Sequence, residues 1–162
     1  MTVNHFIEPY DQVNEQDLWD DLITEAISIH GDEFRYIPRH LGNYDQLFGQ
    51  DDSSIYNAAY AIEMQVVNTY GFTGDKDFYS KFGHQVRDEL VLAVSRNRWT
   101  EIIGDNENQS VPNEGDLVYS HRYKKLFVIK YVDPRESFYQ HGALYTWELT
   151  CEVFEVSGED IE

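Results

Sequence analysis

The stretch GDLVYSHRYKKLFVIKYVDPRESFYQHGALYTWELTCEVFEVSGEDIE, residues 115–162, decides the fold that we predict for this chain. Two short apolar runs, 116–120 and 126–132, are separated by the polar turn HRYKK, which is the pattern of a β-hairpin. The dipeptide DP ends the second run, and residues 143–156 then alternate between apolar and polar side chains. We therefore expect three strands, and we expect them to join a larger sheet because a lone hairpin is only marginally stable in water.

The last of these strands has one apolar face. A period of two puts the apolar residues on one side of the strand and the polar ones on the other, as a half-buried strand requires. The apolar set is Tyr145, Trp147, Leu149, Cys151 and Val153. We expect Trp147, Leu149, Cys151 and Val153 to form a core stripe with Leu90, Leu92, Val128 and Ile129 as neighbours. Cys151 is interpreted as a small core hydrophobe, and as the only cysteine it forms no internal disulfide.

Near the N-terminus the spacing predicts an amphipathic helix over residues 15–30, after a polar arm at 1–14. Its apolar residues recur at intervals of three and four, the helical period; they are Leu18, Trp19, Leu22, Ile23, Ala26 and Ile27. Asn14 is the predicted N-cap and Gly31 the predicted end. We expect this helix to bury Trp19, Leu22 and Ile23, and to expose Asp17, Asp20, Asp21 and Glu25.

After the helix, aromatic residues spaced too irregularly for a helix suggest a short strand near residues 34–37. Alternation then predicts two further strands, near 60–67 and 84–95. A short helix is expected at 75–81 between two glycines, and the polar stretch 97–113 is expected to be an exposed or mobile loop. The sequence thus predicts an α+β fold: a small β-barrel or sandwich of five to six mainly antiparallel strands, with an N-terminal amphipathic helix and a short inserted helix. We expect one domain over 1–162, with the arm at 1–14, the helix at 15–30 and the barrel with its loops at 34–156.

The charge balance restricts the partners. Thirty acidic residues against twelve Lys and Arg give a formal charge of −18. Such a chain is a poor ligand for nucleic acid or anionic membranes, which require clustered cations. No apolar run reaches the length of a membrane span, so we expect a soluble protein made in the cytoplasm, with no membrane partner.

The sequence shows no catalytic, cofactor or metal motif. The six histidines lack metal-ligand spacings, and phosphate-binding and nucleophile motifs are absent. With thirty acids, adjacent carboxylates arise by composition alone and are interpreted as solvated surface charge. We therefore expect no catalytic residue, no cofactor and no metal ion.

Several runs, taken in order, point to a family. NEGDLVYS, KKLFVIKYV, SFYQHGALY and CEVFEVSGE, with YIPRHL, YDQLFG and FYSKFGHQVRDELVLAVSR upstream, cover roughly residues 18–162. In order and spacing the chain resembles the neck protein, also called the head-completion or head-closure protein, of T-even-like contractile-tailed bacteriophages. No single run is diagnostic, and the resemblance lies in their collinearity.

The resemblance implies a structural virion protein rather than an enzyme. It implies a homo-oligomeric ring, with six copies, in the neck at the head-tail junction, made in the host cytoplasm. The ring would complete the DNA-filled head and connect a portal-side neck or connector protein to the tail terminator protein, while DNA passes without specific binding. Two other classes stay open from the residues alone: a carboxylate-based hydrolase working in a barrel mouth, and a carbohydrate-binding module that exposes Trp99 or Trp147.

Two loops are candidate sites. The loop 39–52 carries more apolar groups than an idle loop needs, and its candidate partner-contact residues are Arg39, Tyr44, Leu47 and Phe48. The alternative is a loop held down by its own aromatic residues. The acidic segment 104–114 is the candidate channel loop, through Asp105, Asn106, Glu107, Asn108 and Gln109, with exposure to outer solvent as the alternative.

Overall fold

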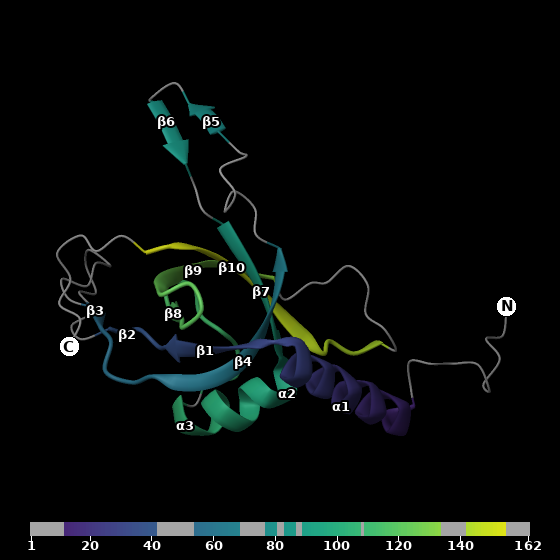
Figure 1. Cartoon of the computed structure of the whole chain (residues 1–162). Helices are drawn as coiled ribbons and strands as arrows, with labels where there is room; N and C mark the ends of the chain where they lie inside the picture. The colour runs from purple at the N-terminus through teal and green to yellow at the C-terminus, as the bar shows by residue number, and fades with distance from the viewer. Residues whose placement is uncertain are drawn as a thin grey trace, which may run out of the picture.

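The computed structural model describes residues 12–41, 54–68, 77–80, 83–86, 89–107, 109–133 and 142–154. Its centre is a closed barrel of six antiparallel strands (Figure 1). The order around the barrel is β1-β4-β7-β10-β9-β8. The strand bounds are β1 Asp32–Ile37, β4 Tyr60–Asn68, β7 Glu89–Ser95, β8 Leu117–Ser120, β9 Lys125–Asp133 and β10 Thr146–Val153. The predicted fold class is confirmed, as a barrel rather than a sandwich.

Alternating burial builds the core. The inward residues of the six strands, joined by Trp99 and Ile103, form one apolar cluster. On β10 the predicted stripe is confirmed for Trp147, Leu149 and Cys151, and Val153 packs against the edge of the cluster. Leu90 and Leu92 on β7 lie in the same cluster, as expected.

On β9, the prediction that both Val128 and Ile129 belong to the core is wrong for Val128. Ile129 is buried, whereas Val128 is only half-buried because consecutive strand residues point to opposite faces. Further along, the register between β9 and β10 shifts between Thr150 and Cys151. Cys151 pairs with Ile129 and Thr150 with Tyr131, so Lys130 is the extra residue of a β-bulge.

Helix α1 spans Val13–His30 and packs beside β4, β7 and α2. The helix itself is confirmed, but its N-cap is Gln12 rather than Asn14, and no side chain in the described part of the chain caps it. Gly31 follows it as predicted, and its N–H donates to the carbonyl of Ile27 at 2.7 Å. Ile27 is the buried residue of the helix.

The predicted facing of α1 is therefore wrong. Trp19 and Leu22 are exposed, Ile23 is half-buried, and Asp20, expected in solvent, is half-buried as well. Asp17, Asp21 and Glu25 are exposed, as predicted. The helix lies on the outside of an already closed barrel, so only a narrow strip of it is covered, and that strip is centred on Ile27.

Two small hairpins lie outside the barrel. One joins β2 (His40–Leu41) to β3 (Ser54–Ile55), and the other joins β5 (Asp77–Ser80) to β6 (Gly83–Val86). The helix predicted over 75–81 is wrong, because β5 pairs along its length with β6. The glycine at 83 begins the second strand of a hairpin there instead of ending a helix.

The stretch predicted as a polar loop, 97–113, begins with helical structure. After β7 the chain forms α2 (Arg96–Trp99), a π-helical turn η3 (Thr100–Gly104) and α3 (Asp105–Glu107). The short helix of the fold is thus here and not at 75–81. The polar composition concealed it, because Trp99 and Ile103 are the buried residues among 96–107.

Candidate interface at one end of the barrel

The helical segment 96–107 packs across the end of the barrel where β7 ends and β8 begins. Ser95 starts it by accepting a hydrogen bond from the N–H of Arg98, an N-cap contact. Trp99 and Ile103 lie one helical turn apart and both enter the core. The Trp99 ring meets the ring of Tyr36 edge-on at 4.6 Å between centroids. These contacts fix the segment to the barrel.

A buried carboxylate organises the loop that follows. Asp116 accepts hydrogen bonds from the Tyr36 hydroxyl, from the Arg39 N–H at 2.7 Å and from Gln109 Nε2 at 3.2 Å. Gln109 Nε2 also lies 2.8 Å from the Tyr36 oxygen, and its carbonyl accepts from Trp99 Nε1. Burial, together with the adjacent Asp116 carboxylate, raises the pKa of Tyr36, so its phenol stays protonated and donates.

This carboxylate is held for structure. Two of its donors, Tyr36 and Arg39, lie at the end of β1 and just after it, and the third is Gln109, so Asp116 ties the end of β1 and the 109–116 loop together. Gly115 beside it has a φ of +94° and lies against Arg39, where a Cβ would stand 3.2 Å from Nη1. A glycine suits this position because its backbone conformation is rarely adopted by other residues.

A polar cleft of about 420 Å³ opens next to this network. Its lining comprises Pro38, Arg39, His40, Glu107, Gln109, Ser110, Val111 and Asn113. Glu107 accepts from the Tyr60 hydroxyl and lies 3.5 Å from His40 Nε2, which attaches α3 to β4 and β2. The cleft therefore has walls held by hydrogen bonds, with exposed polar groups at its rim.

The cleft brings parts of the two predicted sites together. Arg39, from the candidate contact loop, and Glu107 and Gln109, from the candidate channel loop, line the same surface. Asp105 and Asn106 are exposed on α3, where Asn106 Nδ2 donates to the Ile102 carbonyl at 2.6 Å. Tyr44, Leu47, Phe48 and Asn108 lie outside the described residues.

The sequence interpretation missed Tyr36 and Asp116. Both were assigned to strands, and nothing local marks them as partners, because they lie 80 residues apart. Only the pairing of β1 with β8, which closes the barrel, brings them together. The single local signal was Asp116, an acidic residue directly before an apolar run.

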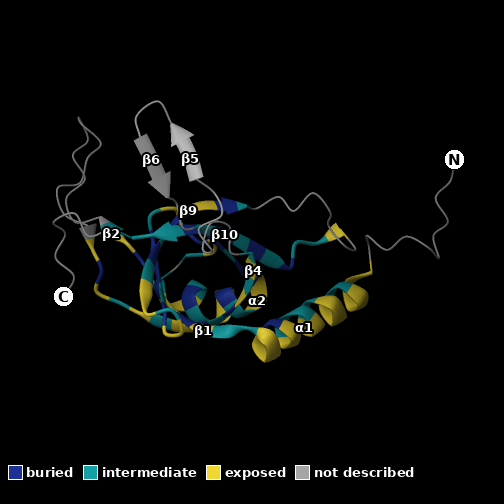
Figure 2. Ribbon diagram, turned by 45° about the horizontal axis from the view of Figure 1, so that its top comes forward, coloured by how far each residue is buried: buried dark blue, intermediate teal, exposed yellow. Residues whose placement is uncertain are grey.

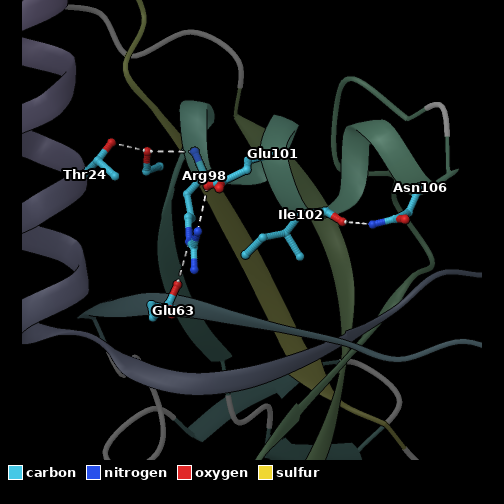
Figure 3. A network of polar contacts seen from close by, with 7 residues as sticks. Thr24, Glu63, Arg98, Glu101, Ile102 and Asn106 are labelled. Atoms are coloured by element: carbon cyan, nitrogen blue, oxygen red, sulfur yellow. Dashed lines mark hydrogen bonds and ion pairs between the residues drawn. The ribbon is translucent and has the colours of Figure 1, made fainter.

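A second polar network joins α1 to the helical segment (Figure 3). Arg98 lies between Glu63 on β4 and Glu101 on η3, with nitrogen–oxygen distances of 3.2 and 2.6 Å. Thr24 of α1 shares a 2.7 Å hydrogen bond with Ser95. The hydrogen bond from Arg98 lowers the pKa of Glu63, so this carboxyl is ionised at neutral pH. A cleft of about 430 Å³ lies here, with Asp21, Thr24 and Glu25 on the α1 side.

The carbohydrate-binding alternative finds little support in the described part of the chain. Trp99 and Trp147 are 0 % and 5 % exposed, so neither forms an open platform for a sugar ring. Among the described residues there is no group of three His, Cys, Asp or Glu side chains that could hold a metal ion. The described helices also include none that is long and apolar enough to cross a membrane.

The fold and the site define a class: a small closed antiparallel barrel that carries one outer helix and has one end covered by hydrogen-bonded helical turns. Its most organised polar cluster is occupied by its own donors, and the chain has a formal charge of −18. Comparison with protein families matches the whole chain, residues 1–162, to the T4 neck protein family, described as "Virus neck protein". The chain belongs to this family of T4-like phage neck proteins, which makes it a structural component of the virion neck.

Proposed function

We propose that the protein forms a closed ring, with six copies, that completes the DNA-filled head and joins a portal-side neck or connector protein to the tail terminator protein. Membership of the neck protein family over the whole chain carries the proposal. A neck component lies between a head and a tail, and a ring leaves a central path for DNA. The role is structural and needs neither turnover nor a cofactor.

The structure supports an assembly role in two ways. The barrel has no free sheet edge, because its six strands close on each other. The barrel itself then associates through side-chain surfaces rather than strand addition, while the two-stranded sheets β2–β3 and β5–β6 outside it keep open edges. The surfaces on offer are the exposed face of α1 and the cleft beside Asp116, which lie on different parts of the barrel.

Within this proposal, the loop that starts at Arg39, with Tyr44, Leu47 and Phe48, contacts a neck partner, and the segment Asp105–Gln109 faces the channel. The adjacency of Arg39 to Glu107 and Gln109 supports a shared surface at this end of the barrel. Carboxylates along a channel repel DNA phosphates at close range, and salt screens the repulsion beyond about 8 Å. Such a wall is non-adhesive rather than a long-range barrier.

The ring proposal is tested by complementation. Filled heads made without this protein should fail to join tails and should lose DNA, and adding the purified full-length protein should restore joining. The same protein, either alone or mixed with its neck partners, should also sediment as a ring-sized oligomer. Heads that join tails normally without the protein would contradict the proposal.

The channel segment needs a test that spares the barrel. Removing residues 105–109 would also remove Gln109 and Glu107, which bind Trp99, Tyr36 and Tyr60. We therefore choose the double variant Asp105→Ala and Asn106→Ala, whose side chains are exposed. Rings should still assemble, but filled heads should release DNA faster, as a nuclease-protection assay measures. Unchanged retention would place the channel surface elsewhere.

A further inference from the structure

Helix α1 presents an apolar stripe to solvent. Leu18, Leu22 and Ile29 are 58 %, 47 % and 67 % exposed. Their spacing of four and seven residues puts them on one helical face, about opposite the buried Ile27. Single exposed apolar residues are ordinary, but a row of them along one helix marks a contact surface. Much of α1 is exposed in the structure (Figure 2).

An acidic edge runs beside this stripe. Asp17, Asp21 and Glu25 follow at intervals of four and are all exposed. The helix as a whole has five carboxylates and no Lys or Arg. Two copies of α1 packed against each other would bring like charges together, which is unfavourable. The surface that covers α1 should therefore be basic, and different from α1 itself.

The opposite wall of the same barrel has that character. In the order β1-β4-β7-β10-β9-β8, the β8–β9 pair stands across the barrel from β4 and β7, against which α1 packs. Residues 117–133 hold four of the chain's twelve Lys and Arg, with Asp133 as their only carboxylate. Lys124 and Lys130 are exposed, and Arg122 is two-thirds exposed. Two of them have carboxylates nearby on neighbouring strands: Arg122 pairs with Asp32 on β1, and Lys130 lies 3.9 Å from Glu152 on β10.

The β8–β9 wall also offers apolar surface. Leu126 and Val128 are half-buried on the outer face of β9. At the β-bulge, Lys130 and Tyr131 are both exposed side by side, where regular alternation would turn one of them inward. Tyrosines and apolar groups with charges at the rim are typical of protein interfaces. The wall thus complements α1 in charge and in apolar content.

We propose that the apolar stripe and acidic edge of α1 dock on the β8–β9 wall of a second copy of this chain. The two surfaces lie on opposite walls of one barrel, so the contact is head-to-tail and leaves one free surface at each end of a chain of copies. Repetition of such a contact gives a ring when the rotation closes. The inference rests on the proposed ring and names the surfaces that build it.

Charge reversal tests the pairing. Asp17→Lys with Asp21→Lys on α1, or Lys124→Glu with Lys130→Glu on the wall, should each abolish the ring fraction in sedimentation velocity of the full chain, with neck partners present where assembly requires them. Combining all four substitutions should restore it. The control pair Asp105→Lys with Glu114→Lys makes the same charge change as the α1 pair on residues outside both surfaces, and should leave assembly unchanged. Failure of the combined variant to recover, or loss of assembly in the control, would overturn the pairing.

Cross-linking in assembled particles gives a test that does not depend on the isolated chain. Particles whose only copies carry Leu22→Cys and Tyr131→Cys, treated with a short bis-maleimide, should give a ladder of products beyond the dimer. The native Cys151 is buried, and burial raises its pKa to about 12, so it stays unreactive.

The outcomes separate this inference from the ring proposal. Each single cysteine variant should remain monomeric on the gel, and a dimer from Leu22→Cys alone would show an α1–α1 contact and overturn the inference. A ring seen by microscopy without the ladder would overturn the head-to-tail surfaces and leave the neck ring standing. Particles with neither ring nor ladder would contradict both.

Discussion

Leu149 lies in the middle of β10 with no exposed surface, surrounded by the barrel core. Replacing it with Ala should lower the free energy of unfolding by about 2 to 5 kcal/mol, because the cavity adds to the lost transfer energy. Chemical denaturation of the full chain measures this loss of unfolding free energy. The matched control is Val67→Ala on β4, where the side chain is half-exposed and the change should stay within about 0.5 kcal/mol. Equal stability of both variants would contradict the assigned core.

Asp20 gives a prediction about pH. Burial, and then the neighbouring Asp21, raise its pKa, and its Oδ1 is buried with no hydrogen-bond partner among the described residues. A raised pKa means that the folded state binds the proton more tightly, so stability falls as pH rises through the range between the unfolded and folded pKa values. Asp20→Asn should therefore raise the melting temperature at neutral pH, and the gain should vanish below about pH 4.

The exposed neighbour Asp21 provides the control for that experiment. Asp21→Asn should shift the melting temperature less, because its carboxyl is already in solvent. A loss of stability in Asp20→Asn at neutral pH would mean that the attraction between Asp20 and Arg96, which opposes the shift, outweighs the cost of burial.

At the scale of elements, Gly31 sets how closely α1 approaches β4. A Cβ here would stand 2.5 Å from the Ile27 carbonyl oxygen and 2.9 Å from the Met64 oxygen, both backbone atoms that cannot rotate away. Gly31→Ala should destabilise the fold by about 1 to 3 kcal/mol, as overpacking does. The thermal unfolding midpoint is the measurement.

Gly104 in η3 is the counterpart of Gly31. A Cβ there would stand 3.4 Å from the Thr100 side chain and 3.7 Å from the Gln109 carbonyl oxygen, both ordinary contacts. Gly104→Ala should be neutral or stabilising by up to about 1 kcal/mol, because glycine is a poor helix former. Equal changes in the unfolding midpoint for Gly31→Ala and Gly104→Ala would contradict the close approach of Gly31 to the Met64 backbone.

The elements that the sequence predicted are those whose own apolar residues recur at a regular interval, two in a strand or three and four in α1. β10 was predictable because its apolar residues Trp147, Leu149 and Cys151 stand at every second position. That pattern is visible without knowing which strands lie beside β10. The facing of α1 was not predictable, because its apolar residues Leu18 and Leu22 lie away from the barrel, where only further contacts give them a role. The helical turns after Ser95 had a weak signal, the cap with Trp99 and Ile103 four residues apart, which the polar residues around them concealed.

The candidate site depended still more on the fold. Arg39 and Gln109 were chosen separately, on local composition, and the structure places both beside Asp116. Their meeting needs the barrel to close between β1 and β8, a long-range event that no local pattern records.

For the whole molecule, the charge of −18 predicts that the protein does not retain DNA. Binding to duplex DNA draws on cations that displace counterions, and the described cations are few and partly paired with carboxylates. A filter-binding titration at moderate salt should show no measurable affinity. The variant Asp17→Lys with Asp21→Lys serves as a control for net charge alone and should also show none. Salt-sensitive retention by the parent protein would contradict a non-adhesive wall.

Microscopy of the neck in assembled particles tests the central claim most directly. Electron cryo-microscopy at a resolution that traces α1 should show six copies of this chain as a closed ring between the portal-side neck protein and the tail terminator. In that ring, α1 of each copy should lie on the β8–β9 wall of the next. Copies that stand apart without touching, or a neck in which this chain is absent from the head-tail junction, would contradict the account.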